Sequence, residues 1–213
     1  MLIKRFFFAI SMKELYTKEY GHRQGGTNGF FGLRNNARVR YFVDWIKPAR
    51  GESILEVGCN RGLLLRALKA QGALVYGIDI NRGIVDELEL PFIKYGAVEN
   101  IPYAPASFDK VIASEILEHV ENPRVAIKEI ERVVKPGGRV FVTYPIEQIR
   151  GIGALADSIA VFGTLHHCRL LHRTKFSIKT LDSIIEGTKL KRETDWVRFI
   201  YWPLRFVELK KTI

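Results

Sequence analysis

Short apolar runs alternate with helix-forming stretches through the middle of the chain. Five runs are mostly apolar, which is typical of buried strands, and the predicted strands are 53–57, 74–78, 92–95, 110–113 and 139–143. Between several of them the residues favour helix, and the predicted helices are 63–70, 81–90 and 123–134. Lys135 to Gly138 is predicted to be a turn between the last helix and the last of these strands.

This alternation predicts βαβ units, a parallel sheet and right-handed crossovers. Open parallel sheets bind their ligands at the carboxyl ends of the strands. We therefore expect the functional residues to come directly after positions 57, 79, 95 and 113.

The end of the chain interleaves aromatic residues with Lys and Arg over residues 194–211. This pattern fits contact with a membrane surface or with single-stranded nucleic acid. It also fits a closing pair of strands with buried aromatic side chains, which is the interpretation that we favour. The longest continuous apolar run, Phe6 to Ile10, is far shorter than the roughly 20 residues of a membrane-spanning helix, so no span is expected.

The composition is that of an ordinary globular protein. Hydrophobic residues make up 47% of the 213 residues and charged residues 26%, which excludes a mainly disordered chain. The net charge of +10 is unevenly placed: residues 1–50 carry +7, residues 51–150 carry −2 and residues 151–213 carry +5. Basic flanks favour anionic partners such as nucleic acid, a phosphorylated substrate or anionic lipid, and a generally basic surface that aids solubility is the alternative.

Two cysteines, Cys59 and Cys168, are too few for a disulfide framework, and we expect a reduced, cytoplasmic protein. The first residues, MLIKRFFFAIS, have the charge pattern of a signal peptide, but the apolar patch is too short for one. An edge strand or a flexible leader is the favoured interpretation. Whether translation starts at Met1 or at Met12 stays open.

A glycine-containing loop, Glu56-Val-Gly-Cys-Asn-Arg-Gly62, follows the first predicted strand. Gly58 allows a sharp turn off the strand, and Asn60 is one of the few non-glycine residues that tolerate a left-handed backbone. Gly62 permits close approach of a ligand where the next helix begins. On its own this loop is a weak signal, because a tight turn without a ligand has the same residues.

Asp79 strengthens the case for a ligand. It lies 21 residues after Gly58, at the predicted end of the second strand, where a carboxylate can bind both hydroxyls of a ribose. Capping of the following helix is the alternative. The loop lacks the third glycine of the G-x-G-x-x-G pyrophosphate motif, which disfavours a nicotinamide-dependent oxidoreductase.

Four motifs resemble, in order and spacing, those of class I S-adenosylmethionine-dependent methyltransferases: ILEVGCNRG, YGIDI, GAVENIPYAPASFDKVIASEILEHVENP and VVKPGGRVFVTYP. The resemblance covers about residues 51–145, and HRTKFSIKTLDSIIEG is similar to the family's last helix before its closing hairpin. It implies an α/β fold with a Rossmann-like, mostly parallel sheet, a closing antiparallel strand and helices on both faces. The chain then divides into a basic N-terminal lid or helical extension, 1–50, and a methyltransferase domain, 51–213. Within the extension, Tyr16 to Leu33 is a candidate lid over the cofactor, and a mobile leader is the alternative.

The resemblance implies S-adenosyl-L-methionine as the cofactor and assigns it a set of binding residues. These residues are Glu56, Gly58, Asn60, Gly62, Asp79, Ile80, Ala97, Val98, Ser114 and Glu115. Asn60 stands where the family usually has a glycine, and Ala97 stands where it often has an acid that binds the adenine amino group. Ser114 and Glu115 match positions beside the methionine moiety and the reacting methyl group.

Methyl transfer from a sulfonium is an in-line displacement, so the protein supplies alignment and a dry pocket, and needs a base only for a protonated nucleophile. His119 is the best candidate for this catalytic base, and a structural histidine that orients its loop is the alternative. A second group of ligating side chains lacks a partner Cys-x-x-Cys element, so no metal site is expected and a position lining the substrate pocket is favoured. This group consists of His166, His167, Cys168 and His172.

The sequence therefore predicts a methyltransferase that acts on a small-molecule acceptor, which is anionic if the basic flanks face the pocket. The signature of nucleobase amino-methylases is absent after the fourth strand, which reads ASEIL, although RNA-directed methylation survives as an alternative. A catalytically silent cofactor-binding partner subunit is a further alternative, for which Ala97 is the best support. The acceptor atom and the oligomeric state stay open.

Overall fold

In the computed structural model of this chain, residues 29–146, 176–200 and 203–213 are described, with backbone only for residues 29–36. Seven strands form one sheet in the order β3-β2-β1-β4-β5-β7-β6. Five of them are mutually parallel, as the βαβ pattern predicts. They are β1 (Ser53–Val57), β2 (Leu74–Asp79), β3 (Ile93–Tyr95), β4 (Phe108–Ser114) and β5 (Val134–Pro145).

A C-terminal hairpin completes the sheet. Its strands are β6 (Leu190–Phe199) and β7 (Pro203–Lys211), and β7 pairs antiparallel with both β5 and β6. Because β7 alone is reversed, β6 ends at the same edge of the sheet as β1 to β5. The last segment forms a closing pair of strands, as expected. Its aromatic side chains are only partly buried, since Phe206 is fully buried whereas Phe199 is 71% exposed.

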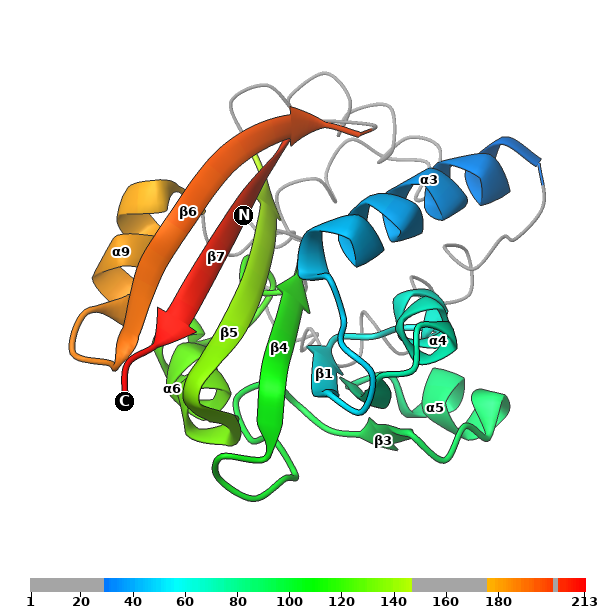
Figure 1. Cartoon of the computed structure of the whole chain (residues 1–213), viewed down its shortest axis with the longest axis horizontal. Helices are drawn as coiled ribbons and strands as arrows, with labels where there is room; N and C mark the ends of the chain where they lie inside the picture. The colour runs from blue at the N-terminus through cyan, green and yellow to red at the C-terminus, as the bar shows by residue number, and fades with distance from the viewer. Residues whose placement is uncertain (1–28, 147–175, 201–202) are drawn as a thin grey trace, which may run out of the picture.

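Helices cover both faces of the sheet, as expected (Figure 1). The first face carries α3 (Gly29–Ile46), α4 (Leu63–Ala70) and α5 (Arg82–Leu88), and the second carries α6 (Pro123–Val133) and α9 (Ile178–Ile185). No helix in the described ranges is long and apolar enough to cross a membrane.

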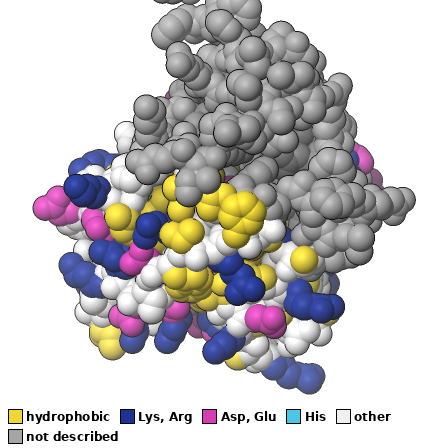
Figure 2. Space-filling view, turned by 90° about the horizontal axis from the view of Figure 1, so that it is seen from above, with side chains coloured by type: hydrophobic (Ala, Val, Ile, Leu, Met, Phe, Trp, Pro, Cys, Tyr) yellow, Lys and Arg dark blue, Asp and Glu magenta, His cyan; other side chains and the backbone are white. Residues whose placement is uncertain are grey.

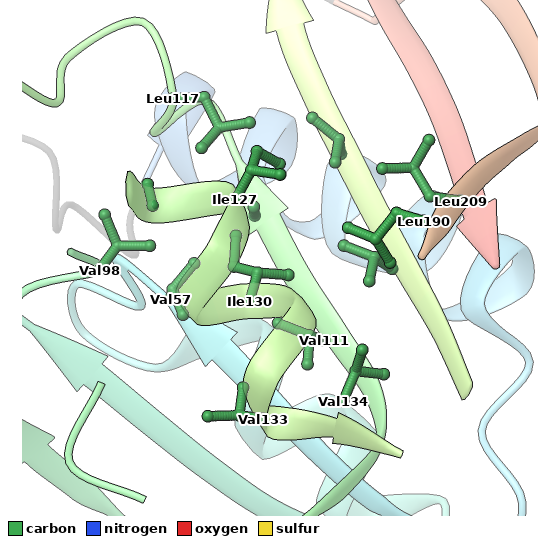
Figure 3. Packing of buried hydrophobic residues seen from close by; sticks show 14 of the residues in the cluster. Val57, Val98, Val111, Leu117, Ile127, Ile130, Val133, Val134, Leu190 and Leu209 are labelled. Atoms are coloured by element: carbon green, nitrogen blue, oxygen red, sulfur yellow. The ribbon is translucent and has the colours of Figure 1, made fainter. Parts of the chain in front are cut away.

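Alternate side chains of the strands pack into two hydrophobic layers. On one face, Ile127, Ile130 and Val133 of α6 pack against Val57 of β1 and Val111 of β4 (Figure 3). The layer on the other face lies under α3, α4 and α5 and includes residues of the same strands, such as Ile54 and Ile112. The side chains of both layers are buried and closely packed, which holds the strands of the sheet in fixed positions.

The helix starts follow from their caps. The Asn81 side chain accepts a hydrogen bond from Ile84 N at the start of α5, and the Asn122 side chain accepts one from Val125 N at the start of α6, ahead of a proline at the first helical position. Asparagine is a favoured N-cap residue because its side-chain oxygen can accept from the amides of the first helical turn, which have no partner inside the helix.

The prediction of a turn at Lys135 to Gly138 is wrong. The strand β5 already begins at Val134 and runs through this stretch. The pairing of β4 with β5 shifts register there, so the extra residues form an irregularity inside the strand pair. Gly138 permits this course, since a Cβ atom at this position would lie 2.8 Å from the carbonyl oxygen of Asp109.

Candidate active site

The loop after β1 has the backbone that its glycines suggest. Gly58, Asn60 and Gly62 all have positive φ angles, of 71°, 47° and 66°. The amides of Gly58 and Cys59 both donate to Ile78 O, at 2.8 and 3.0 Å, which folds the loop over the end of β2. The left-handed conformation expected for Asn60 is confirmed.

Asp79 connects this loop to the end of β2. Its Oδ2 accepts a hydrogen bond from Asn60 N at 2.7 Å, and its Oδ1 accepts one from Asn81 N at 2.8 Å. Burial raises the pKa of Asp79, and the backbone donors counteract part of that rise. The side chain that caps α5 belongs to Asn81, not to Asp79. An ionised carboxylate has about four acceptor positions, so the group can still accept from a ligand hydroxyl beside its backbone donors.

Glu56 lies under the same loop and is only 8% exposed. Within the described part of the chain its Oε2 has no hydrogen-bond partner. Burial raises the pKa of Glu56 to about 8, with Arg38 opposing the rise and Asp79 adding to it. A buried acceptor without a partner calls for an explanation, and a donor or cation on a bound ligand supplies one.

Ser114 and Glu115, at the carboxyl end of β4, are held by a residue from α3. Arg38 donates to Ser114 Oγ at 2.7 Å and forms an ion pair with Glu115 Oε1 at 3.0 Å. Ser114 Oγ also lies 3.0 Å from Thr143 Oγ1 on β5, within hydrogen-bonding distance. Sequence reasoning missed Arg38 and Thr143, because no motif connects them with the loops that they stabilise.

The stretch after β3 forms a small turn next to Asp79. Gly96 N donates to Asp79 O at 3.0 Å, and Ala97 pairs with Asn100 in an isolated antiparallel bridge. The side chain of Val98 is buried in the hydrophobic layer under α6 and is therefore not available to a ligand. Ile80, the other residue expected near adenine, is half-buried directly after β2.

His119 lies in the turn that follows β4. Its side chain is 13% exposed, and its Nε2 is 3.9 Å from Oε1 of the buried Glu118. Its backbone amide donates to Ile116 O at 3.0 Å. The arrangement fits an oriented histidine near the site, and its role as a base stays a prediction.

Two predictions concern segments outside the described residues. These are the candidate lid, which lies largely before residue 29, and the ligating cluster at 166–172. Within the ranges that are described, no group of three or more His, Cys, Asp or Glu side chains is arranged to hold a metal ion.

The residues at the carboxyl edge therefore fit a nucleoside that carries a charged amino acid. Asp79 offers acceptors for ribose hydroxyls, and the Gly58–Gly62 loop lies beside it with little side-chain bulk. Glu56 offers a buried acceptor for an ammonium group, and the charge of Arg38 favours its ionised form. These are the parts of S-adenosylmethionine.

The chain also resembles known proteins in sequence. Residues 55–142 match a protein family that is described as "Methyltransferase domain". The ubiquinone biosynthesis O-methyltransferase of Thiobacillus denitrificans is 37% identical over 168 residues, which cover 75% of this chain and 70% of that protein. The enzyme of the same name from Paracidovorax citrulli is 38% identical over 110 residues, 47% of this chain and 46% of that protein. The chain thus spans about half the length of the first curated relatives that it matches.

Solved structures agree on the fold. A protein from Pyrococcus horikoshii superposes with a TM-score of 0.71 at 14% identity, covering 93% of this chain and 99% of that one. The magnesium protoporphyrin IX methyltransferase of Synechocystis, solved with bound S-adenosylhomocysteine, superposes with a TM-score of 0.64 at 18% identity, covering 88% of this chain and 90% of that one. Together with the match to the Thiobacillus relative, which extends over most of both chains, these findings place the chain in a family: it belongs to the class I S-adenosylmethionine-dependent methyltransferases.

Proposed function

We propose that this chain transfers a methyl group from S-adenosylmethionine to a hydroxyl of a small-molecule acceptor. The observation that carries the proposal is the Asp79 carboxylate, which accepts a hydrogen bond from Asn60 N in the Gly58–Gly62 loop and another from Asn81 N at the start of α5. The buried Glu56 carboxyl, whose Oε2 has no partner in the described part of the chain, lies beneath the same loop. The hydroxyl acceptor is supported by the relatives, whose names describe O-methyltransferases.

Bound S-adenosylmethionine would supply the methyl group, which would pass from the sulfonium sulfur to the acceptor oxygen and leave a neutral thioether. The chain's own residues align the partners. Asp79 would accept hydrogen bonds from the ribose hydroxyls, and Glu56 would accept one from the ammonium group. Arg38 keeps Ser114 and Glu115 in place at the end of β4. His119 takes the proton that the acceptor hydroxyl loses, so that charge balances.

Two further statements belong to the same proposal. The two cysteines support a reduced, cytoplasmic location, and the described Cys59 is a free, buried thiol. Residues 1–50 are proposed to act as an N-terminal extension of the methyltransferase domain at 51–213. Ala97 favours one competing function, a catalytically silent partner subunit, because it offers no acid to the adenine amino group.

Calorimetric titration with S-adenosylhomocysteine, S-adenosylmethionine and NAD tests the proposal. We expect both sulfur ligands to bind and NAD not to bind. Asp79→Asn is expected to weaken the binding of S-adenosylhomocysteine by about 1.5–3 kcal/mol, the scale of a hydrogen bond to a charged group. Asp86→Asn is the matched control, because Asp86 is an exposed carboxylate on α5 and its loss should leave affinity unchanged.

Saturable NAD binding that neither sulfur ligand displaces would contradict the proposal. An unchanged affinity for S-adenosylhomocysteine in a folded Asp79→Asn variant would mean that Asp79 does not bind the ribose. Tight binding of S-adenosylmethionine without methyl transfer to any of a panel of phenols and hydroxy acids would favour the silent subunit.

A further inference from the structure

The end of the β6–β7 hairpin lies at the same edge of the sheet as the candidate active site. Arg198 of β6 pairs with Leu204 of β7, and Leu204 pairs with Pro145 at the end of β5. Phe199 then pairs with Pro203, one step further out. Figure 1 shows β6 running past α9 to this upper edge.

The two faces of β6 differ sharply near this end. On the face toward α3, Trp196 Nε1 donates to the Tyr41 hydroxyl at 3.0 Å, and the Arg198 guanidinium lies 4.2 Å from the centre of the Tyr41 ring. The side chains of Val197 and Phe199 alternate with these and point to the opposite face. They are 47% and 71% exposed.

The exposure follows from how far α9 reaches. The helix lies over the first part of β6, where Arg192 forms an ion pair with Asp182 of α9. Beyond α9, the side chains of Val197 and Phe199 are exposed to solvent near the end of the hairpin, where polar residues are usual. Viewed from above, hydrophobic side chains gather in the middle of the described surface, with Lys and Arg beside them (Figure 2).

We propose that this hairpin end docks on the surface of an anionic phospholipid bilayer. Val197 and Phe199 enter the boundary between headgroups and acyl chains, and Arg198 stays at headgroup level beside the Tyr41 ring. Aromatic and aliphatic side chains next to a guanidinium are the composition that binds membrane interfaces. The chain's net charge of +10 adds attraction to anionic headgroups.

The neighbouring charges fit a bilayer better than single-stranded nucleic acid. Arg192 and Arg205, the other arginines of the hairpin, are both ion-paired with Asp195 in the described structure. They are therefore occupied, whereas a strand of phosphates needs a row of available cations. Val197 also has no ring on which a base could stack. Docking at this edge would bring the carboxyl ends of the parallel strands, where the candidate active site lies, close to the membrane surface.

Vesicle sedimentation of the whole chain tests the docking surface. The probes are vesicles of phosphatidylcholine alone and of phosphatidylcholine with phosphatidylglycerol in equal parts. We expect binding to the anionic vesicles, and at least about tenfold weaker binding after the joint change Val197→Ser and Phe199→Ser. Phe199→Trp should retain binding. Leu74→Ser is the matched control, since Leu74 is 54% exposed at the start of β2, on the opposite edge.

Thermal unfolding and titration with S-adenosylhomocysteine, both without vesicles, establish that each variant is folded and keeps its cofactor site. Failure of docking is thus separate from failure of the proposed function. The inference is overturned by absent binding to anionic vesicles, by equal binding to both vesicle types, or by binding that the double change leaves intact. Stacking of poly-U on Phe199, lost in Phe199→Ser and kept in Phe199→Trp, would assign the surface to nucleic acid instead.

Discussion

Glu56 has a protonation state that depends on what lies beside it. With its pKa at about 8, the carboxyl of the ligand-free chain is mostly protonated at neutral pH. Of its charged neighbours, Arg38 favours ionisation and Asp79 opposes it, while burial raises the pKa of the adjacent Cys59 thiol, which stays neutral. An ammonium group bound next to Glu56 favours the ionised form. Raising the pH toward 8 increases the fraction of chains in which Glu56 is ionised. The affinity for a ligand with an ammonium group should therefore increase with pH and level off above about pH 8.

The affinity for S-adenosylhomocysteine should therefore rise between pH 6 and pH 8, by at most about tenfold per pH unit. Calorimetric titration across this range measures the slope. In Glu56→Gln the slope should vanish, because the amide does not titrate. His119→Gln is the control, since histidine ordinarily titrates near pH 6.5, and it should retain the slope. A slope that survives in Glu56→Gln would belong to another group.

Single residues of the site differed in how far the sequence could predict them. Gly58, Asn60 and Asp79 follow strands directly, so a parallel sheet alone brings them to one edge. Arg38 and Thr143 carry no such positional signal. Arg38 reaches Ser114 only because α3 packs where it does, 76 residues earlier in the chain, and that packing is a property of the folded molecule.

At the scale of elements, α3 shows why helices are harder to predict than buried strands. The strands are marked by continuous apolar runs, whereas the apolar residues of α3 are interspersed with Arg and Asn. The described part of the helix is nevertheless anchored in the core, with Phe42 and Ile46 almost fully buried. Trp45 packs edge-on against Phe141 of β5, with ring centres 5.0 Å apart. The proposed N-terminal extension thus contains an element that the sheet needs.

Truncating Phe42 should show this dependence. Phe42→Ala is expected to lower the free energy of unfolding by about 3–5 kcal/mol, because it removes a buried ring and leaves a cavity. Urea unfolding followed by fluorescence measures the change. Asp44→Ala, two residues further along the same helix and exposed, should stay within about 0.5 kcal/mol of the unchanged protein. Equal stability of Phe42→Ala and the unchanged protein would mean that α3 is not part of the cooperative core.

For the whole molecule, the alternation of apolar runs and helices predicts the layers of the fold but not the order of the strands. The position of β1 between β2 and β4, and of β7 between β5 and β6, depends on long-range packing that no local pattern encodes. The same limit applies to charge. The sequence shows that the flanks are basic, but only the structure shows which cations already have a carboxylate beside them.

The difference between the total basic charge and the cations that are not ion-paired determines how strongly the chain should bind RNA. A net charge of +10 alone would favour a polyanion. Many cations of the described surface are, however, ion-paired with carboxylates, and they release few counterions when a phosphate arrives. These residues are Arg38, Arg61, Lys110, Arg132, Lys135, Arg139, Arg192 and Arg205.

We therefore expect weak binding of a labelled poly-U oligonucleotide, with a shallow dependence on salt. Each neutralised phosphate of a single strand contributes about −0.7 to the slope of log K against log salt concentration, so contact with two or three phosphates gives a slope of about −1 to −2. Fluorescence anisotropy at a series of salt concentrations measures it, with S-adenosylhomocysteine affinity as the control that should change little. A slope steeper than about −4 would require six or more phosphate contacts. Such a slope would contradict the small-molecule acceptor and favour the RNA-directed alternative.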